Sequence, residues 1–242
     1  MLSGQELARY DRQLTIPGWG EDGQRKLKDS KVVVVGAGGL GSAVLVYLAV
    51  TGVGTIRVVD GDVVDLTNLN RQVLYTDADV GRKKVDSALE KLRELNPYVK
   101  VEPIAEPITD ENALDILGDY PIVDALDNLP GRYVVNRVAV ERGLPLFHGG
   151  VHGFEGAATT VIPGTTPCLR CLYKGVSQGS VPVAGVTVAV IGCVQATEFL
   201  KYVLGIGGML VGRMLSYDGL AMRFTEFKLK KDPNCDVCGR TG

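Results

Sequence analysis

The chain has 242 residues, of which 45% are hydrophobic and 22% are charged, and its formal net charge is −2. This size and composition are typical of a globular protein with one substantial core. The near-neutral charge gives no general reason to expect binding to nucleic acid or to an anionic membrane surface. The apolar runs are interrupted before the roughly 18 residues of a membrane span, so no transmembrane helix is predicted. The first six residues lack the pattern of a signal peptide, and a cytoplasmic location is therefore expected.

The N-terminal part of the sequence predicts a helical arm followed by a βαβ unit. Residues 1–30 are charged and helix-like, with a turn at residues 17–20. Residues 31–35 form a short β-branched run without alternation, which predicts a buried parallel strand. A glycine-rich segment, an apolar helix at residues 42–51 and a second strand at residues 55–59 complete the unit.

The rest of the chain predicts an α/β fold. Strands are expected near residues 99–104, 121–125 and 145–148, and helices near residues 82–95, 110–117 and 132–142. This alternation predicts a Rossmann-like, doubly wound mixed sheet whose N-terminal half is parallel. From residue 149 glycine becomes dense, and antiparallel strands are expected near residues 158–162 and in a hairpin at residues 214–230. One more helix is expected at residues 189–203.

The glycines of residues 36–41 fit the pattern G-x-G-x-x-G, with a predicted strand before them and a helix after them. Such glycines permit a tight turn and a close approach of the backbone to phosphate at a helix N-terminus. Asp60, about 20 residues further on at the end of the second strand, is placed to accept hydrogen bonds from ribose hydroxyls. The pattern predicts nucleotide binding but does not identify the nucleotide.

Two cations and an acid narrow the class of nucleotide enzyme. Arg71 and Lys84 suit a nucleotidyl transferase, which must neutralise a triphosphate and release pyrophosphate, whereas hydride transfer has no need of them. Asp127 follows a predicted strand at the carboxyl edge of the sheet and is a suitable magnesium ligand. Each residue taken singly has an ordinary explanation as a solvated surface charge or a helix cap, so the interpretation depends on the set.

Motifs along the whole chain carry a family resemblance; they are residues 9–13, 36–41, 68–72, 81–84, 127–128, 167–171 and 234–238. Together they resemble the ThiF/MoeB/HesA family, the bacterial and archaeal relatives of ubiquitin-activating enzymes. The resemblance extends from about Ala8 to Gly239. It implies ATP-dependent adenylation of the C-terminal glycine carboxylate of a ubiquitin-like sulfur carrier protein that ends in Gly-Gly, with release of pyrophosphate.

The resemblance also implies the roles of individual residues. The catalytic residues would be Arg71, Lys84, Asp127 and Arg12, the last reaching into the active site of the other subunit of a homodimer. Asp60 would hold the ribose and Asp127 would hold Mg²⁺. The nucleotide-binding set would be Gly36, Gly38, Gly39, Gly41, Asp60, Asn68, Arg71, Gln72, Lys84, Asp127 and Asn128. The pathway stays open among thiamin, molybdopterin, tRNA thiolation and protein modification.

Four of the five cysteines form two Cys-x-x-Cys pairs, Cys168 with Cys171 and Cys235 with Cys238. In a reducing compartment this pattern favours a metal over disulfides. Four thiolates suit tetrahedral Zn²⁺, and a closed site of this kind is structural because no position remains for water. The alternative is a reactive redox pair. Cys193 lies in an apolar helix and is expected to be a small buried hydrophobe.

One departure from the family concerns a loop cysteine that many relatives carry. The corresponding residues 178–186 contain none, and Ser180 lies near the expected position. A serine without an activating base cannot replace a thiolate, so the enzyme is expected to stop at the acyl-adenylate without a covalent link to its partner. The adenylate would then pass to an external persulfide or amine. His148 and His152 are expected to be a polar pair at the edge of the nucleotide cleft without a catalytic role, and Trp19 a packing anchor for the arm.

Two other functions compete with adenylation. A nicotinamide oxidoreductase would use the same glycine loop, but Arg71, Lys84 and the four-cysteine site count against it. A non-catalytic scaffold that binds a ubiquitin-like protein is disfavoured by the complete set of charged residues. Without repeats or a low-complexity linker, residues 1–242 are expected to form one adenylation domain, with an arm at 1–30, a nucleotide-binding half at 31–150 and a zinc-bearing, partner-binding half at 151–242.

Overall fold

The computed structural model describes residues 1–176 and 182–239 and is built around one mixed sheet. The strand order is β3-β2-β1-β4-β5-β6-β7-β8. Strands β1 to β5 are parallel, and β6, β7 and β8 add in antiparallel fashion. The strands are Lys31–Val35, Thr55–Val59, Lys100–Ile104, Ile122–Asp124, Leu146–His152, Glu155–Val161, Arg213–Asp218 and Arg223–Lys228. The predicted fold class, a parallel N-terminal half with antiparallel C-terminal strands, is confirmed.

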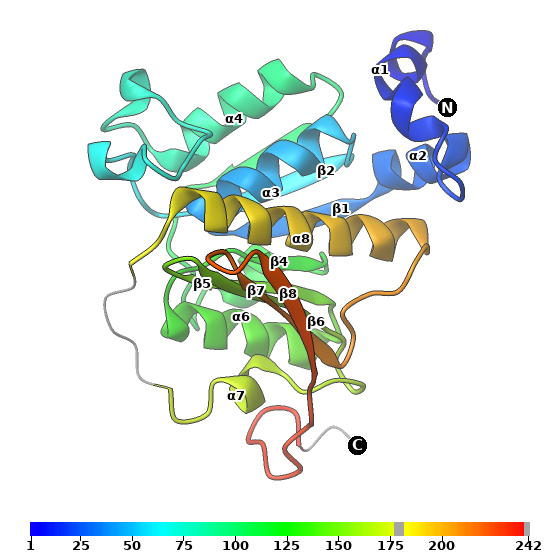
Figure 1. The fold of residues 1–242 in the computed structure, drawn as a ribbon. Helices are drawn as coiled ribbons and strands as arrows, with labels where there is room; N and C mark the ends of the chain where they lie inside the picture. Colours follow the sequence, from blue (N-terminus) through cyan, green and yellow to red (C-terminus); the bar gives the residue numbers. More distant parts are fainter. Residues whose placement is uncertain (177–181, 240–242) are drawn as a thin grey trace.

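Helices cover both faces of the sheet, as a doubly wound fold requires (Figure 1). Helices α3 (Gly39–Val50), α4 (Lys84–Leu95) and α8 (Gly185–Leu204) lie on one face, and α8 packs against α3. Helices α5 (Ala113–Leu117), α6 (Leu129–Arg142) and α7 (Leu169–Leu172) lie on the other. Because β1 is covered on both sides, its four valines divide between the two cores: Val32 and Val34 enter one, Val33 and Val35 the other.

The predicted boundaries differ from the observed ones mainly where glycine is dense. Strand β5 continues to His152, four residues beyond the predicted end, because Gly149 and Gly150 pair with Ala158 and Ala157 of β6. Helix α8 begins at Gly185 rather than 189. Two short 3₁₀ helices, η1 (Leu66–Asn68) and η2 (Asp77–Asp79), were not predicted.

The N-terminal arm consists of two helices, α1 (Gly4–Leu14) and α2 (Gly20–Asp29). Asn96, which follows α4, donates to the Tyr10 hydroxyl at 2.9 Å, and Gln13 donates to the carbonyl of Thr51, which follows α3. Trp19 packs against the main core, as predicted for an anchor. The arm therefore lies beside the C-terminal ends of α3 and α4, the ends opposite the glycine loop.

Helix α8 is long and apolar enough to cross a membrane by length and composition alone, which the sequence analysis did not anticipate. It nevertheless packs against β5, β6 and α3, and Ile191 and Phe199 are fully buried there. The helix is therefore a core element of this fold.

Candidate active site

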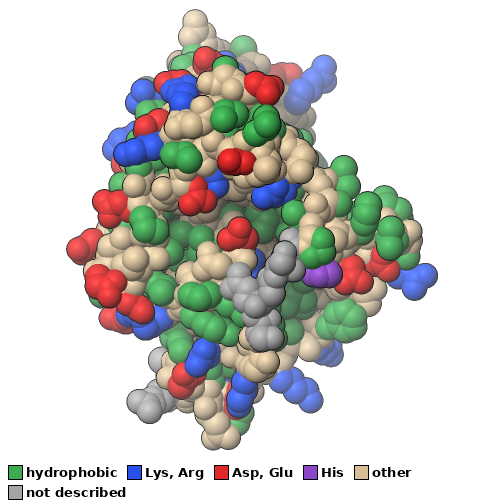
Figure 2. All heavy atoms as spheres, turned by 90° about the vertical axis from the view of Figure 1, so that its left-hand side faces the viewer, with side chains coloured by type: hydrophobic (Ala, Val, Ile, Leu, Met, Phe, Trp, Pro, Cys, Tyr) green, Lys and Arg blue, Asp and Glu red, His purple; other side chains and the backbone are tan. Residues whose placement is uncertain are grey.

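A cavity of about 1280 Å³ lies at the carboxyl ends of β1, β2 and β4. Figure 2 shows it as a hollow in which hydrophobic and acidic side chains meet. The position is the point where the strand order reverses, between β1 and β4, where open α/β sheets bind their ligands. Typical small-ligand pockets measure about 300–1,000 Å³, so this cavity has room for a nucleotide and part of a second substrate.

The glycine loop adopts a conformation that only glycine permits at two positions. Gly36 has φ +99°, and a Cβ there would lie 2.6 Å from the carbonyl oxygen of Ala125. A Cβ on Gly41 would lie 2.0 Å from the carbonyl oxygen of Gly36. Gly38 is the N-cap of α3 and supplies no side-chain cap, so backbone N–H groups of the first turn are available to an anion.

Asp60 ties the glycine loop to the end of β2. Its two carboxylate oxygens accept hydrogen bonds from the backbone N–H groups of Ala37 and Asp62, each at 2.8 Å. A carboxylate offers about four acceptor positions, so capacity remains for ribose hydroxyls. The predicted role of Asp60 is compatible with this geometry.

Lys84 occupies a position that is unfavourable for a positive charge. It is the first residue of α4, where the helix dipole disfavours a cation, and its side chain is only 7% exposed. Its Nζ pairs with the Asp62 carboxylate at 2.9 Å. Arg71, which also lines the cavity, donates to the Thr67 carbonyl at 3.0 Å. The buried Lys84 cation at the N-terminus of α4 and the glycine loop thus line the same cavity.

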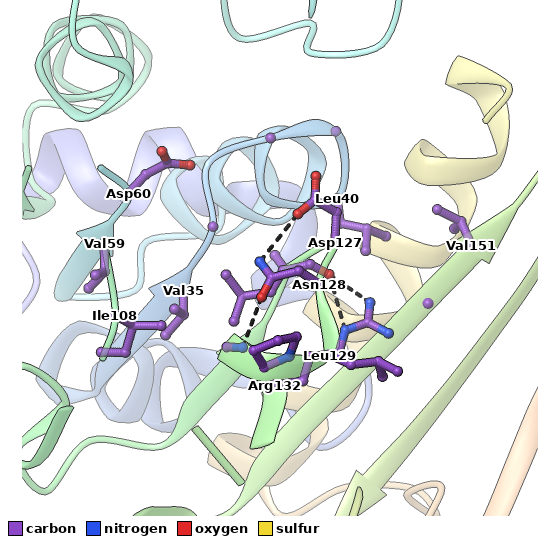
Figure 3. A pocket seen from close by; sticks show the side chains of 18 of the residues that line it. Val35, Leu40, Val59, Asp60, Ile108, Asp127, Asn128, Leu129, Arg132 and Val151 are labelled. Carbon is purple, nitrogen blue, oxygen red and sulfur yellow. Dashed lines mark hydrogen bonds between the residues drawn. The ribbon is translucent and has the colours of Figure 1, made fainter. Parts of the chain in front are cut away.

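The loop after β4 carries Asp127 and Asn128 (Figure 3). Asn128 caps α6, because its Oδ1 accepts from the Gly131 N–H at 2.8 Å, and its Nδ2 lies 3.5 Å from Asp127. Asp127 is exposed toward the cavity. Oxygen ligands of this kind suit the hard cation Mg²⁺.

Arg132 holds this loop in place and was not recognised from the sequence. Its guanidinium donates to the Leu126 carbonyl at 2.6 and 3.2 Å (Figure 3). It also donates to the Gly149 carbonyl of β5 at 2.9 Å. The side chain is 10% exposed and lies 3.7 Å from the buried Asp124 carboxylate. The sequence did contain a signal that could have identified Arg132: it is a cation in the first turn of a helix, where positive charge is disfavoured, and it follows Asp127 and Asn128 closely.

His148 is not at the edge of the cleft as expected; it is fully buried beneath it. Its Nδ1 lies 2.6 Å from Asp124 and its Nε2 lies 2.7 Å from the Tyr173 hydroxyl, so three residues form a continuous chain. Burial lowers the pKa of His148, against the opposing effect of Asp124, and keeps the ring neutral at physiological pH. His152 is exposed and lines the cavity.

The structure brings most of the predicted nucleotide-binding residues to this one cavity; those lining it are Gly36, Gly38, Gly39, Asp60, Arg71, Gln72, Lys84, Asp127 and Asn128. Gly41 does not line the cavity; it packs against the backbone of the glycine loop, where only glycine fits. Asn68 is turned to its own backbone, accepting from the Asp65 N–H in a capping box. Arg12 is exposed on α1, at the far end of α3, a 12-residue helix that spans about 18 Å.

The four paired cysteines converge, although they come from two distant segments. Their sulfur atoms all lie within 4.8 Å of one another, with Cys168–Cys235 at 3.7 Å and Cys171–Cys238 at 3.5 Å. A tetrahedron with Zn–S bonds of about 2.3 Å has sulfur atoms about 3.8 Å apart, so the cluster fits Zn²⁺. Cys193 is half-buried rather than buried, and burial raises its pKa.

The cysteine thiols differ in acidity. Burial raises the pKa of Cys168. Burial also opposes ionisation of Cys235, but the N–H groups of Cys238 and Val237 outweigh it and lower its pKa to about 7. A thiolate is the form that binds metal, and the N–H groups would stabilise it. Ser180 and the other residues of 178–181, in the segment that lacks the family cysteine, lie outside the described residues.

A Rossmann-like sheet with a phosphate-type glycine loop, two cations and a loop carboxylate defines a nucleotide-binding protein with a transferase-type site. Comparison with known proteins narrows this class. The model of the ThiF family matches residues 10–237, and the chain belongs to that family.

The curated relatives include two of nearly the same length. One is the SAMP-activating enzyme E1 of Haloferax volcanii, 44% identical, with 100% of this chain and 92% of the relative covered. Another is a sulfur carrier protein adenylyltransferase of Thermus thermophilus, 46% identical, with 97% and 92% covered. Among solved structures, E. coli MccB with ATP superposes with a TM-score of 0.83 at 25% identity, covering 98% of this chain and 75% of MccB.

Proposed function

We propose that this chain adenylates the C-terminal glycine carboxylate of a ubiquitin-like sulfur carrier protein, using ATP and releasing pyrophosphate. The observation that carries the proposal is the convergence of the glycine loop, Asp60, Arg71, Lys84 and Asp127 on one cavity. The relatives named as a SAMP-activating enzyme and a sulfur carrier adenylyltransferase support this choice of reaction and substrate.

In the proposed reaction the glycine carboxylate attacks the α-phosphorus of ATP. A carboxyl oxygen–phosphorus bond forms, the bond between the α-phosphorus and the bridging oxygen breaks, and pyrophosphate leaves with both electrons. Arg71 and Lys84 stabilise the charge that builds on the phosphates. Lys84 can do so by exchanging its contact with Asp62, which is 74% exposed, for a phosphate oxygen.

Two metals fit the donor sets that the chain provides. Asp127 would hold Mg²⁺, which when bound neutralises phosphate charge and favours departure of pyrophosphate. Cys168, Cys171, Cys235 and Cys238 would hold a structural Zn²⁺. The second set lies in the C-terminal half and would tie the tail of the chain to α7.

The C-terminal half, residues 151–242, is proposed to bind the carrier. Its outermost hairpin exposes large apolar side chains, which commonly mark interaction surfaces. Within the described residues of the hairpin they are Leu220, Met222, Phe224 and Phe227, exposed by 52 to 80%, and Phe154 of the turn between β5 and β6, 46% exposed, is hydrogen-bonded to the hairpin through its carbonyl. Residues 1–242 would thus form one adenylation domain whose two halves take the nucleotide and the protein substrate.

The remaining expectations complete the proposal. The chain works as a cytoplasmic homodimer in which Arg12 reaches the partner's cavity, since within its own chain it lies at the opposite end of α3. The adenylate passes to an external sulfur donor. The nicotinamide oxidoreductase and the scaffold are less well supported, because neither uses the two cations and Asp127 together.

ATP–pyrophosphate exchange tests the proposed function. Wild-type protein should exchange label only when Mg²⁺ and a small ubiquitin-like protein ending in Gly-Gly are present. Asp127→Ala should lower the rate by about 10²–10³, as for loss of one preorganised charge contact. Asp119→Ala is the matched control, since Asp119 is 90% exposed and forms a surface pair with Arg142. Exchange at the full rate in Asp127→Ala would remove this residue from the mechanism.

A further inference from the structure

The buried chain Asp124–His148–Tyr173 fixes the direction of every hydrogen bond along it. Asp124 and His148 are both 0% exposed, and the Asp124 carboxylate also accepts from the Leu126 N–H at 3.1 Å. A carboxylate only accepts, so His148 Nδ1 carries the imidazole proton. Neutral Nε2 is then an acceptor, and the Tyr173 hydroxyl must donate to it over 2.7 Å.

This arrangement leaves Tyr173 as a hydrogen-bond acceptor toward the cavity. Its only proton points at His148, and its one further polar contact on the hydroxyl within the described residues is a long 3.5 Å approach from Arg132. The ring is held edge-on to His148 at 5.4 Å between centroids. The backbone carbonyl of Tyr173 is also held, by the Tyr133 hydroxyl at 3.0 Å. The oxygen is therefore fixed in position and in polarity.

The Tyr173 oxygen stands over a part of the cavity that is built of backbone. A Cβ on Gly150 would lie 3.2 Å from it, and Ala157, which pairs with Gly150 across β5 and β6, lies on the same face of the sheet. This wall is separate from the glycine loop within the same cavity, because β4 lies between β1, which leads into the loop, and β5. Because Gly150 and Ala157 carry almost no side chain, this wall accommodates an extended peptide backbone better than a base or a sugar.

We infer that Tyr173 is a positioning residue for the carrier, accepting a hydrogen bond from a backbone N–H of its C-terminal peptide. The inference rests on the proposed function and deepens it. An N–H is the donor that every peptide offers, and a fixed acceptor one or two residues from the reacting carboxylate would set its approach to phosphorus. His148 and Asp124 act through Tyr173, holding its proton away from the substrate.

The test combines Tyr173→Phe with carriers that lack one N–H. The carrier is the Gly-Gly protein that supports exchange, made by semisynthesis with an ester in place of the last or the penultimate amide. With wild-type enzyme, one of the two esters should raise the KM for the carrier by roughly 2- to 12-fold, as for loss of one hydrogen bond. Tyr173→Phe should raise the KM for the native carrier to a similar extent and leave the KM for ATP unchanged.

The combined effect of the ester and of Tyr173→Phe on the KM for the carrier distinguishes a direct hydrogen bond from a structural effect. If Tyr173 accepts from that N–H, the same ester causes no further loss in Tyr173→Phe. The inference would be overturned if the two esters raised the KM for the carrier equally, and by the same factor in wild type and in Tyr173→Phe. It would also be overturned if Tyr173→Phe changed the KM for ATP in parallel with the KM for the carrier. If wild-type enzyme gives no carrier-dependent exchange at all, the proposed function itself is wrong and the inference fails with it.

Discussion

Replacement of Arg132 by methionine should be among the most destabilising single changes on α6. Methionine keeps much of the apolar volume but removes all donors, leaving the Leu126 and Gly149 carbonyls without the guanidinium and Asp124 without its nearby cation. Breaking a buried charged contact of this kind costs about 3–5 kcal/mol. For a chain of this size each kcal/mol lowers the melting temperature by about 2–4 °C, so a fall of roughly 6–20 °C is expected.

Arg137→Met is the matched control, since it removes the same side chain from the same helix. Arg137 is 38% exposed and pairs with Asp110, which is 67% exposed. Such surface pairs are worth about 0–1 kcal/mol. Urea denaturation followed by circular dichroism measures both variants against wild type. If the two variants lose equal stability, Arg132 does not brace the loop after β4 and the argument from its hydrogen bonds is refuted.

Three further predictions concern the glycine loop, the cysteine cluster and the arm. Gly41→Ala should unfold the loop and lower the melting temperature, because the new Cβ would lie 2.0 Å from a backbone oxygen. In Gly38→Ala the new Cβ would approach a side chain at 3.6 Å, so this variant should weaken ATP binding with little loss of stability. Calorimetry of both variants with and without ATP checks these two expectations. Purified protein should contain about one Zn²⁺ per chain by metal analysis, and Cys235→Ser should lose both metal and thermal stability. Mixing inactive Arg12→Ala and Arg71→Ala chains should restore one of the two sites in each mixed dimer, because the other site receives both lesions. Random subunit exchange makes about half of the dimers mixed, so about a quarter of the wild-type activity should return. No recovery despite proven exchange would place Arg12 outside the partner's site.

Much of the fold could be predicted because its signals are local. The valine run of β1 has no alternation, which requires cover on both faces, and the structure buries Val32 to Val35 in two cores. The end of β5 was misjudged for a physical reason. Gly149 and Gly150 have low strand propensity, but the antiparallel partner β6 supplies their hydrogen bonds. That pairing is a tertiary effect, which no local pattern reports.

The residues of the candidate site also divide into those that local sequence patterns predict and those that they do not. The glycine loop and Asp60 follow from spacing along one βαβ unit, and the cysteine pairs follow from their own spacing. The chain Asp124–His148–Tyr173 does not, because its members belong to β4, β5 and the end of α7 and meet only when parallel strands align their carboxyl ends. His148, beside two glycines, was predicted to lie at the edge of the nucleotide cleft, since nothing local indicated a buried carboxylate opposite its ring.

Helix α6 connects the nucleotide cavity to the cysteine cluster. Its first turn faces the cavity through Asn128 and Arg132, and one turn later Asn136 accepts from the Leu169 N–H at the start of α7. Helix α7 carries the first cysteine pair and ends at Tyr173, whose hydroxyl returns to the strands beneath the cavity. A metal that fixes α7 therefore acts on the wall of β5 and β6, where the peptide is proposed to lie. The glycine loop is held by separate contacts, from Asp60 and from α3 itself, so loss of the metal should affect the protein substrate before the nucleotide.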